Sequence, residues 1–249
     1  MGTATPGNLA KRTDEWFVPR FGPEKFRVFL GLLFLPYTGM VLSYTVIGSM
    51  LAHQLQWDRV LAICVIYFLG LGIAAHALDA LGSKRVKPWG NVFGKRALWM
   101  TAVASLCGAY AIGIYYIVFH VPLLAPVAVL EGFFVFAYNL EWFGGRFHTD
   151  KWFAFSWGFL PLTAGYIIQT NSISPEVVLV GAAMFLFSYV EINASRPYKE
   201  LKRRRGEMHE NDKNVMLRYE AILKSISIGV IVLAIGLAVW RGLLPIIAG

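Results

Sequence analysis

Seven long apolar segments constrain the fold of this chain more than any other feature of its sequence. They cover about 28–51, 59–81, 97–118, 121–142, 152–170, 175–195 and 221–243. A helix rises about 1.5 Å per residue, so about 20 apolar residues cross a hydrocarbon core that is about 30 Å thick. Each spanning segment must also satisfy its own backbone hydrogen bonds in lipid. We therefore expect an all-α integral membrane protein with a bundle of about seven transmembrane helices.

The composition supports the same class. Hydrophobic residues make up 57% of the chain and charged residues only 15%, and the mean hydropathy is +0.55. Soluble globular domains carry about 25% charged residues. Because no internal repeat and no flexible linker divides the chain, we expect a single transmembrane domain over 1–249, with 1–25 as a polar amino-terminal segment.

The distribution of positive charge predicts an orientation. Lys and Arg are concentrated in 1–25, 82–96, 143–151 and 196–220, whereas the other connections have almost none. Positively charged connections remain on the cytoplasmic side of a membrane. We therefore expect a cytoplasmic amino terminus, a carboxyl terminus on the outside of the inner or cell membrane, and three basic loops on one cytoplasmic face. The net charge of +8 follows from this pattern and implies no nucleic-acid partner.

The first polar cluster ends the second apolar segment. His76 and Asp79 are three residues apart, so they share one face of a helix. Ionisable groups in an apolar span normally face the protein interior or a water-filled cavity. A basic run follows, with Lys84, Arg85 and Lys87. The alternative is a structural His–Asp pair beside cations that extend from a helix end toward the membrane surface.

The second cluster lies where the fourth apolar segment ends. Glu131 is near the middle of that segment, and Gly144 and Gly145 in the following loop permit a tight turn or a close approach to a ligand. Phenol, amide, carboxylate, guanidinium and imidazole groups are gathered within thirteen residues, at Tyr138, Asn139, Glu141, Arg146, His148 and Asp150. The third cluster ends the sixth segment and contains Glu191, Asn193, Arg196 and Lys199. Because all three clusters are expected on one face, they predict a polar site at the cytoplasmic end of the bundle.

Two kinds of chemistry fit these residue types. In the first, carboxylates and an amide hold Mg²⁺, the metal and the cations neutralise a lipid diphosphate, and the apolar helices shelter its tail. In the second, His76 and His148 bind zinc or iron directly together with carboxylates.

The order of the clusters resembles the UbiA superfamily of intramembrane prenyltransferases over roughly residues 20–245. In that family a motif of the type NDxxDxxxD follows the second helix and a basic segment follows the motif. The matching stretch here, AHALDALGS, keeps Asp79 and is followed by Lys87 and Pro88. The best match reads, in the family's order, Tyr138, Thr149, Gly158, Pro161, Gly165 and Tyr166.

The sequence also departs from the family's pattern. His76 stands in place of the first motif's Asp, Glu141 lies where the family has a Leu-Lys-Arg stretch, and the second Asp-rich motif corresponds to Glu191 and Asn193. The resemblance implies an all-helical bundle of about nine spans around a central cavity, whereas the apolar segments here number seven.

Our first hypothesis is a metal-dependent enzyme that acts on an isoprenoid diphosphate, by prenyl transfer or by terpene cyclisation. Asp79, Glu141 and Tyr138 are the expected catalytic residues. Cations are expected to bind the diphosphate: Lys84, Arg85, Lys87, Arg146 and Arg196. The expected metal ligands are Asp79, Asn139, Glu141, Glu191, His76, His148 and Asp150, with Mg²⁺ as the ion.

The alternatives are a redox or hydrolytic enzyme with Zn²⁺ or Fe at the histidines and carboxylates, and a membrane protein that binds lipid without catalysis. Aromatic residues such as Tyr138, Trp157 and Tyr166 are expected to line the cavity and to stabilise a carbocation. Apart from an isoprenoid or other lipid substrate and the surrounding membrane lipids, the sequence predicts no partner, and it leaves the oligomeric state open.

Overall fold

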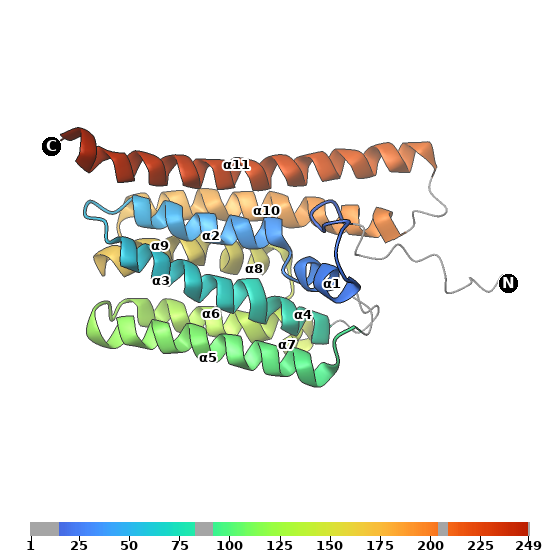
Figure 1. Ribbon diagram of the computed structural model, residues 1–249, viewed down its shortest axis with the longest axis horizontal. Helices are drawn as coiled ribbons and strands as arrows, with labels where there is room; N and C mark the ends of the chain where they lie inside the picture. Colours follow the sequence, from blue (N-terminus) through green and yellow to red (C-terminus); the bar gives the residue numbers. More distant parts are fainter. Residues whose placement is uncertain (1–14, 83–91, 204–208, 249) are drawn as a thin grey trace.

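The apolar segments fold into helices that lie side by side along one long axis (Figure 1). The structure is a computed structural model that describes residues 15–82, 92–203 and 209–248. Within these ranges every regular element is helical. The elements are α1 (Glu24–Leu32), α2 (Leu35–Met50), α3 (Trp57–Tyr67), η2 (Phe68–Ala75), α4 (His76–Gly82), α5 (Lys95–Phe119), α6 (Leu124–Asn139), α7 (Trp142–Gly145), α8 (Asp150–Ala154), η3 (Phe155–Phe159), α9 (Leu160–Thr170), α10 (Pro175–Arg203) and α11 (Glu210–Ala248).

Four helices in the described part are long and apolar enough to cross a membrane. They are Trp57–Gly82, Lys95–Phe119, Pro175–Lys202 and Glu210–Gly242. A fifth span results if α1 and α2, which meet at an angle of 41°, are taken together, and α6 is a shorter apolar helix. The all-α prediction is confirmed and the apolar helices agree with a membrane protein, whereas the number of seven spans stays a prediction.

The helices are irregular at the junction of α1 and α2 and in the segments η2 and η3. Phe34 adopts a left-handed conformation with φ of 43° between α1 and α2, and Pro36 follows in the first turn of α2, where its missing N–H costs nothing. The segments η2 and η3 are π-helical and lie directly before α4 and α9. A π segment adds a residue to the turn and so changes the direction of the side chains that follow, and such segments are frequent at functional sites.

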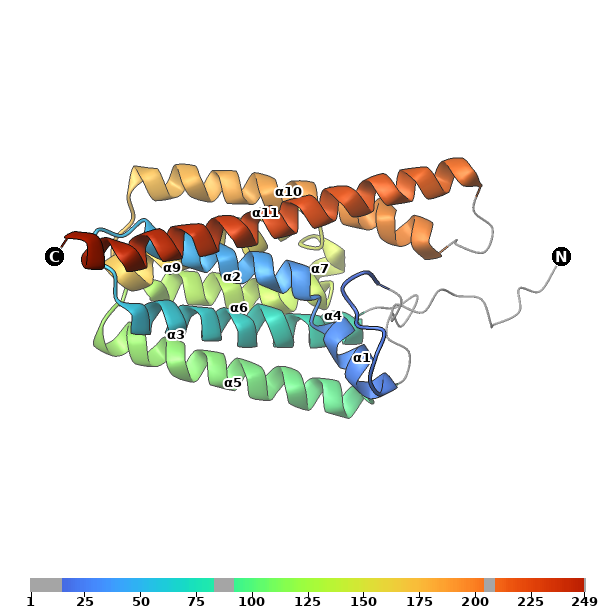
Figure 2. The same cartoon turned by 45° about the horizontal axis from the view of Figure 1, so that its top comes forward.

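Small residues allow the helices to approach one another closely. A Cβ atom at Gly48 would overlap the carbonyl oxygen of Leu162, and one at Gly165 would overlap that of Thr45, so α2 and α9 touch backbone to backbone. Ser49 Oγ donates a hydrogen bond of 2.9 Å to Gly165 O across the same contact. Such small-residue contacts stabilise helix pairs in lipid, where hydrophobic burial gives little driving force. Helix α11 packs along α2 and α10 over the length of the bundle (Figure 2).

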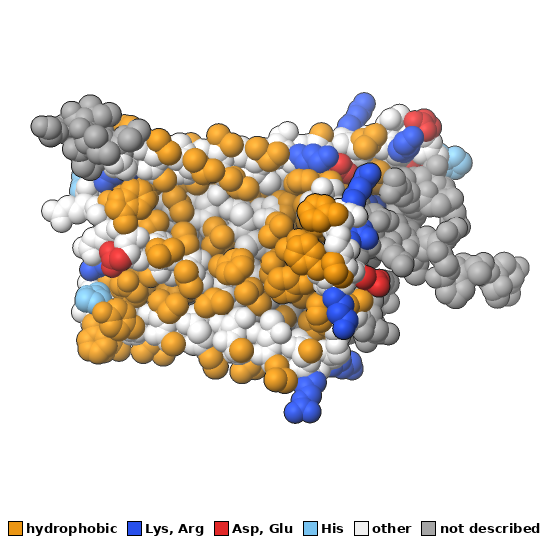
Figure 3. Space-filling model, in the orientation of Figure 1, with side chains coloured by type: hydrophobic (Ala, Val, Ile, Leu, Met, Phe, Trp, Pro, Cys, Tyr) orange, Lys and Arg blue, Asp and Glu red, His pale blue; other side chains and the backbone are white. Residues whose placement is uncertain are grey.

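The surface agrees with this arrangement. On the face seen in Figure 3, hydrophobic side chains are spread along the length of the bundle, and Lys and Arg side chains gather toward the end where α1 and α4 lie. Apolar sides and a basic end are the distribution expected for a helical bundle in lipid.

The described part of the amino-terminal segment, which begins at Glu15, contacts the bundle at that basic end. Glu15 Oε2 lies 2.9 Å from Lys202 Nζ and accepts a hydrogen bond of 3.0 Å from Tyr198 OH. All three side chains are buried, and we call this group the amino-terminal latch. Two residues further on, the ring of Phe17 packs against that of Phe34, with centroids 5.7 Å apart.

Candidate functional site

A cavity of about 180 Å³ opens at the basic end of the bundle, between α2, α4, α6, α10 and the segment that leads into α9. We call it the polar pocket. Its lining combines charged and hydrogen-bonding groups with aromatic rings, and consists of Phe34, Tyr37, His76, Asp79, Tyr138, Asn139, His148, Phe153, Trp157, Glu191, Ile192, Ser195, Arg196 and Lys199.

Helix α10 supplies the charged side of the pocket. Glu191, Ser195 and Lys199 follow one another at intervals of four residues, so they lie on one face of the helix. Glu191 is only 2% exposed, and its Oε1 atom has no hydrogen-bond partner among the described residues. Ser195 accepts a hydrogen bond of 2.7 Å from the hydroxyl of Tyr37. The same face therefore presents a buried carboxylate deep in the helix and a cation nearer its end.

The cations of α10 are each held in a defined place. Lys199 Nζ lies 4.7 Å from the ring centroid of Phe34 and 5.3 Å from that of Tyr37, a cation–π arrangement. Arg196 Nε lies 2.8 Å from Asp150 Oδ1, and its side chain is 46% exposed. Lys199 thus lies over an aromatic wall, whereas Arg196 bridges to the first turn of α8.

His76 lies in an aromatic part of the pocket, directly after η2. Its ring centroid is 5.1 Å from that of Phe34 and 5.2 Å from that of Trp157, and its Nε2 atom lies 3.5 Å from Thr38 Oγ1. Trp157 comes from η3. The two π-helical segments therefore bring residues from separate spans to one side of the pocket.

The end of α6 and the loop after it form the opposite side. His148 Nδ1 lies 2.9 Å from the carbonyl oxygen of Tyr138, and the two rings stack with centroids 4.4 Å apart. A carbonyl only accepts hydrogen bonds, so Nδ1 carries the proton and, in a neutral ring, Nε2 is the acceptor. The amide nitrogen of Asn139 donates to Val135 O at 2.8 Å, which leaves the amide oxygen as its acceptor group.

A close contact fixes the distance between α4 and α6 at this level. A Cβ atom at Gly82 would overlap the carbonyl oxygen of Asn139, so only glycine permits this approach. The contact brings the helix that carries His76 and Asp79 against the helix that ends in Tyr138 and Asn139.

The structure brings most of the predicted site residues together. His76, Asp79, Tyr138, Asn139, His148, Glu191 and Arg196 line the polar pocket, and Asp150 contacts it through Arg196. Lys84, Arg85 and Lys87 lie outside the described residues.

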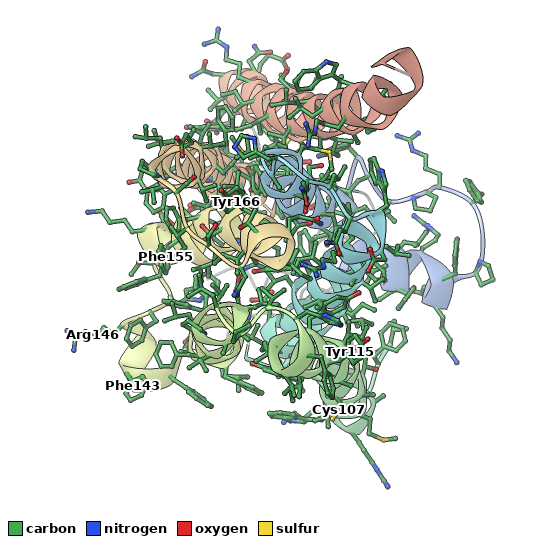
Figure 4. All side chains as sticks on the ribbon, turned by 90° about the vertical axis from the view of Figure 1, so that its left-hand side faces the viewer. Cys107, Tyr115, Phe143, Arg146, Phe155 and Tyr166 are labelled. Carbon is green, nitrogen blue, oxygen red and sulfur yellow. The ribbon has the colours of Figure 1, made fainter. Side chains whose placement is uncertain are left out.

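Three other predicted residues do not line the pocket. Glu141 is partly exposed beyond the end of α6, where its backbone turns with φ of 52°. Arg146 is exposed, and its side chain points away from the bundle (Figure 4). Tyr166, expected to line the cavity, instead packs in the apolar core around Tyr44 and Leu162.

Sequence reasoning did not find Phe34 and Tyr37 as part of the site. The kink between α1 and α2 turns both rings toward α10. A signal was present, because Pro36, Tyr37 and Thr38 interrupt an otherwise apolar segment at its start.

The oxygen and nitrogen donors of the pocket are the groups to consider as metal ligands. Within the described residues, no three His, Cys, Asp or Glu side chains lie close enough together to enclose a metal ion. Zinc and iron sites are normally built from three or four such ligands. Magnesium is usually bound by one or two carboxylates together with substrate phosphates and water. The pocket lining contains two carboxylates, Asp79 and Glu191.

Comparison of the chain with models of known protein families, with curated proteins and with solved structures finds no match. The likeness to the UbiA superfamily therefore rests on the sequence motifs alone.

Proposed function

We propose that the protein is an intramembrane enzyme that acts on an isoprenoid diphosphate, by prenyl transfer or cyclisation, with its reaction centre in the polar pocket. The observation that carries this proposal is the placement of the buried Glu191 carboxylate in one cavity with Asp79, Arg196 and Lys199. A buried carboxylate oxygen without a partner is costly. A substrate that carries a bound metal cation into the pocket would give the Glu191 carboxylate the partner that it lacks.

In the proposed binding mode, Arg196 and Lys199 bind the diphosphate. Both cations lie on the last turns of α10, at the basic end of the bundle. His148 lines the opposite side, where Nε2 accepts a proton or, once protonated, donates to a phosphate oxygen. These groups stabilise the negative charge that grows on the leaving diphosphate as the C–O bond breaks.

Magnesium is the metal that fits the proposal. Asp79 and Glu191 would hold it, with Asn139 as an oxygen donor nearby. When bound with the substrate, Mg²⁺ supplies charge neutralisation to the diphosphate. Glu141, Arg146 and Tyr166 have no part in this mechanism, because they lie outside the pocket.

The aromatic part of the pocket is suited to the carbon skeleton. Phe34, Trp157 and Tyr138 present ring faces next to the charged groups. Such faces attract a cation by about 0.5–2 kcal/mol each, the larger values applying away from water. They would therefore orient the allylic end of the substrate and exclude water from it.

We further propose a UbiA-like bundle with seven passes and a cytoplasmic polar pocket. Helices occupy all seven predicted segments in the expected order, with α8, η3 and α9 together forming the fifth. The gathering of Lys and Arg at the pocket end supports a cytoplasmic location of that end, because positive charge is retained there.

The test uses the purified protein in lipid nanodiscs with Mg²⁺ and farnesyl or geranylgeranyl diphosphate as probes. Binding and diphosphate release are measured for the wild type, Lys199→Gln, Arg196→Gln and Asp79→Asn. Loss of a charged contact is expected to weaken diphosphate binding by about 10- to 100-fold in the first two variants. Asp79→Asn is expected to abolish Mg²⁺-dependent release.

Lys213→Gln serves as the matched control, because Lys213 is exposed on α11 and is not among the residues that line the pocket. Binding of farnesyl diphosphate without release of diphosphate would replace the enzyme by a lipid-binding protein. Stoichiometric zinc or iron in the purified protein, without turnover of any diphosphate, would favour the redox or hydrolytic alternative. Equal binding of farnesol and farnesyl diphosphate would refute the proposed role of Arg196 and Lys199.

A further inference from the structure

A second carboxyl group lies inside the bundle, at a distance from the polar pocket. Glu131 is near the middle of α6 and lines a cavity of about 70 Å³ between α3, η2, α5 and α6. We call it the Glu131 cavity. Its polar side chains are Glu131, Tyr67 and Tyr110, and its other lining residues are apolar.

The hydrogen bonds of the Glu131 cavity leave one oxygen unused. Tyr67 OH donates to Glu131 Oε1 at 2.8 Å, and Tyr110 OH donates to the backbone oxygen of Ala128 at 3.0 Å. Glu131 Oε2 is buried and has no hydrogen-bond partner among the described residues. The hydrogens of both phenols are therefore engaged, and Oε2 is the carboxyl oxygen that lacks a partner in a mainly apolar lining.

We propose that the Glu131 cavity binds the hydroxyl end of an apolar alcohol. A hydroxyl group both donates and accepts, so it satisfies Oε2 whether the carboxyl group is ionised or protonated. A lone water would fill only part of this largely apolar cavity, in which Oε2 is the one polar side-chain atom that lacks a hydrogen bond. An anionic head group would lie next to the carboxyl group of Glu131, and the residues that line the cavity include no cation that could offset the repulsion.

The size and the opening of the cavity fit such a ligand. A volume of about 70 Å³ is about twice the share of one water in the liquid, enough for a hydroxyl group and the first few carbons of a chain. The wall is open at Gly70, where an added Cβ atom would meet no heavy atom within 4 Å. Gly70 and Ile66 are also partly exposed on the side of the bundle. The remaining carbon atoms of the alcohol would extend through this opening toward the lipid.

The test uses a photoactivatable octanol that carries a diazirine, with the intact protein in lipid nanodiscs, and locates the label by mass spectrometry. We expect saturable labelling within 63–71 and 124–135. 1-Octanol should compete with it, whereas octane should not. Glu131→Gln keeps a donor and an acceptor and should retain labelling, whereas Glu131→Leu should weaken it at least tenfold. Gly70→Val should block the opening and reduce labelling with Glu131 intact.

Several results would overturn the assignment. Labelling that does not saturate, or that octane and 1-octanol reduce equally, would leave only an apolar crevice. Competition by octylamine and not by 1-octanol would assign an ammonium ligand instead. If Glu131→Leu does not fold, the competition experiment in the wild type and Glu131→Gln still decides the question. None of these readouts requires turnover, so they are independent of the proposed isoprenoid reaction.

Discussion

Replacing Lys202 by Met should release the amino-terminal segment from the bundle. In the wild type, Lys202 Nζ lies 2.9 Å from Glu15 Oε2, and both side chains are less than one-tenth exposed. Met keeps much of the side-chain volume but removes the positive charge. The carboxylate of Glu15 then retains the hydroxyl of Tyr198, at 3.0 Å, as its partner within the latch.

The magnitude follows from the burial of the pair. Removing one partner of a buried ion pair costs about 3–5 kcal/mol, because the remaining charge is left uncompensated. Glu15 lies before α1, which begins at Glu24, so it can regain water if the segment around it moves out. The cost should therefore appear as local release of the segment around Glu15. A cost of about 3 kcal/mol shifts the ratio of docked to released segment by about 10²-fold.

Hydrogen–deuterium exchange at Val18 measures this release. Its amide donates to Glu15 O at 3.0 Å, so the amide is protected only while the turn is in place. We expect its protection to fall by about 10²-fold in Lys202→Met, and Glu15→Gln combined with Lys202→Met to recover part of it.

The control for the latch is Lys213→Met, which removes an exposed charge 3.8 Å from Glu210 and should change stability by less than about 0.5 kcal/mol. Unchanged protection of Val18 in Lys202→Met, or an equal loss in Lys213→Met, would show that the buried pair does not hold the segment.

Three further predictions concern the bundle and the polar pocket. Gly82→Ala places a Cβ atom against the carbonyl oxygen of Asn139 and should lower the free energy of unfolding by about 1–3 kcal/mol in a denaturant titration. His76→Asn should keep Mg²⁺-dependent turnover within about tenfold of the wild type, because imidazole is not a preferred magnesium ligand; loss of a bound transition metal on this change would contradict the proposal. Glu210→Cys, on the exposed start of α11, should react with an impermeant thiol reagent only from the cytoplasmic side, and labelling of intact cells from outside would reverse the orientation.

Much of the fold follows from local properties of the sequence. A long apolar run in lipid must be helical, so a helix was predictable in each of the seven apolar segments. The ends of the last two were not, because α10 continues to Arg203 and α11 begins at Glu210, within the stretch 196–220 that was expected to be a loop. Side chains at the ends of alternate helices must also lie at the same end of an antiparallel bundle. For this reason His76, Tyr138 and Glu191 were expected near one another, although they are far apart in sequence.

Side-chain direction at the helix ends is set by tertiary packing. Glu141 and Phe143 both have positive φ angles, of 52° and 55°, and these turns leave Arg146 pointing away from the bundle. Two residues later, His148 returns to contact Tyr138. Neither direction follows from residue type or spacing, because a loop without a repeating conformation has no fixed direction for its side chains.

The sequence by itself determined that this chain forms apolar helices with polar clusters at their ends, because apolar length and charge are properties of each segment alone. Only the tertiary structure decided which groups meet. The kink at Phe34 places an aromatic wall next to Lys199, and the packing of η2 against α6 lets Tyr67, at the end of α3, pair with Glu131 across 64 residues of sequence. Such contacts depend on how each helix is rotated about its axis, and that rotation is fixed by close packing against neighbouring helices.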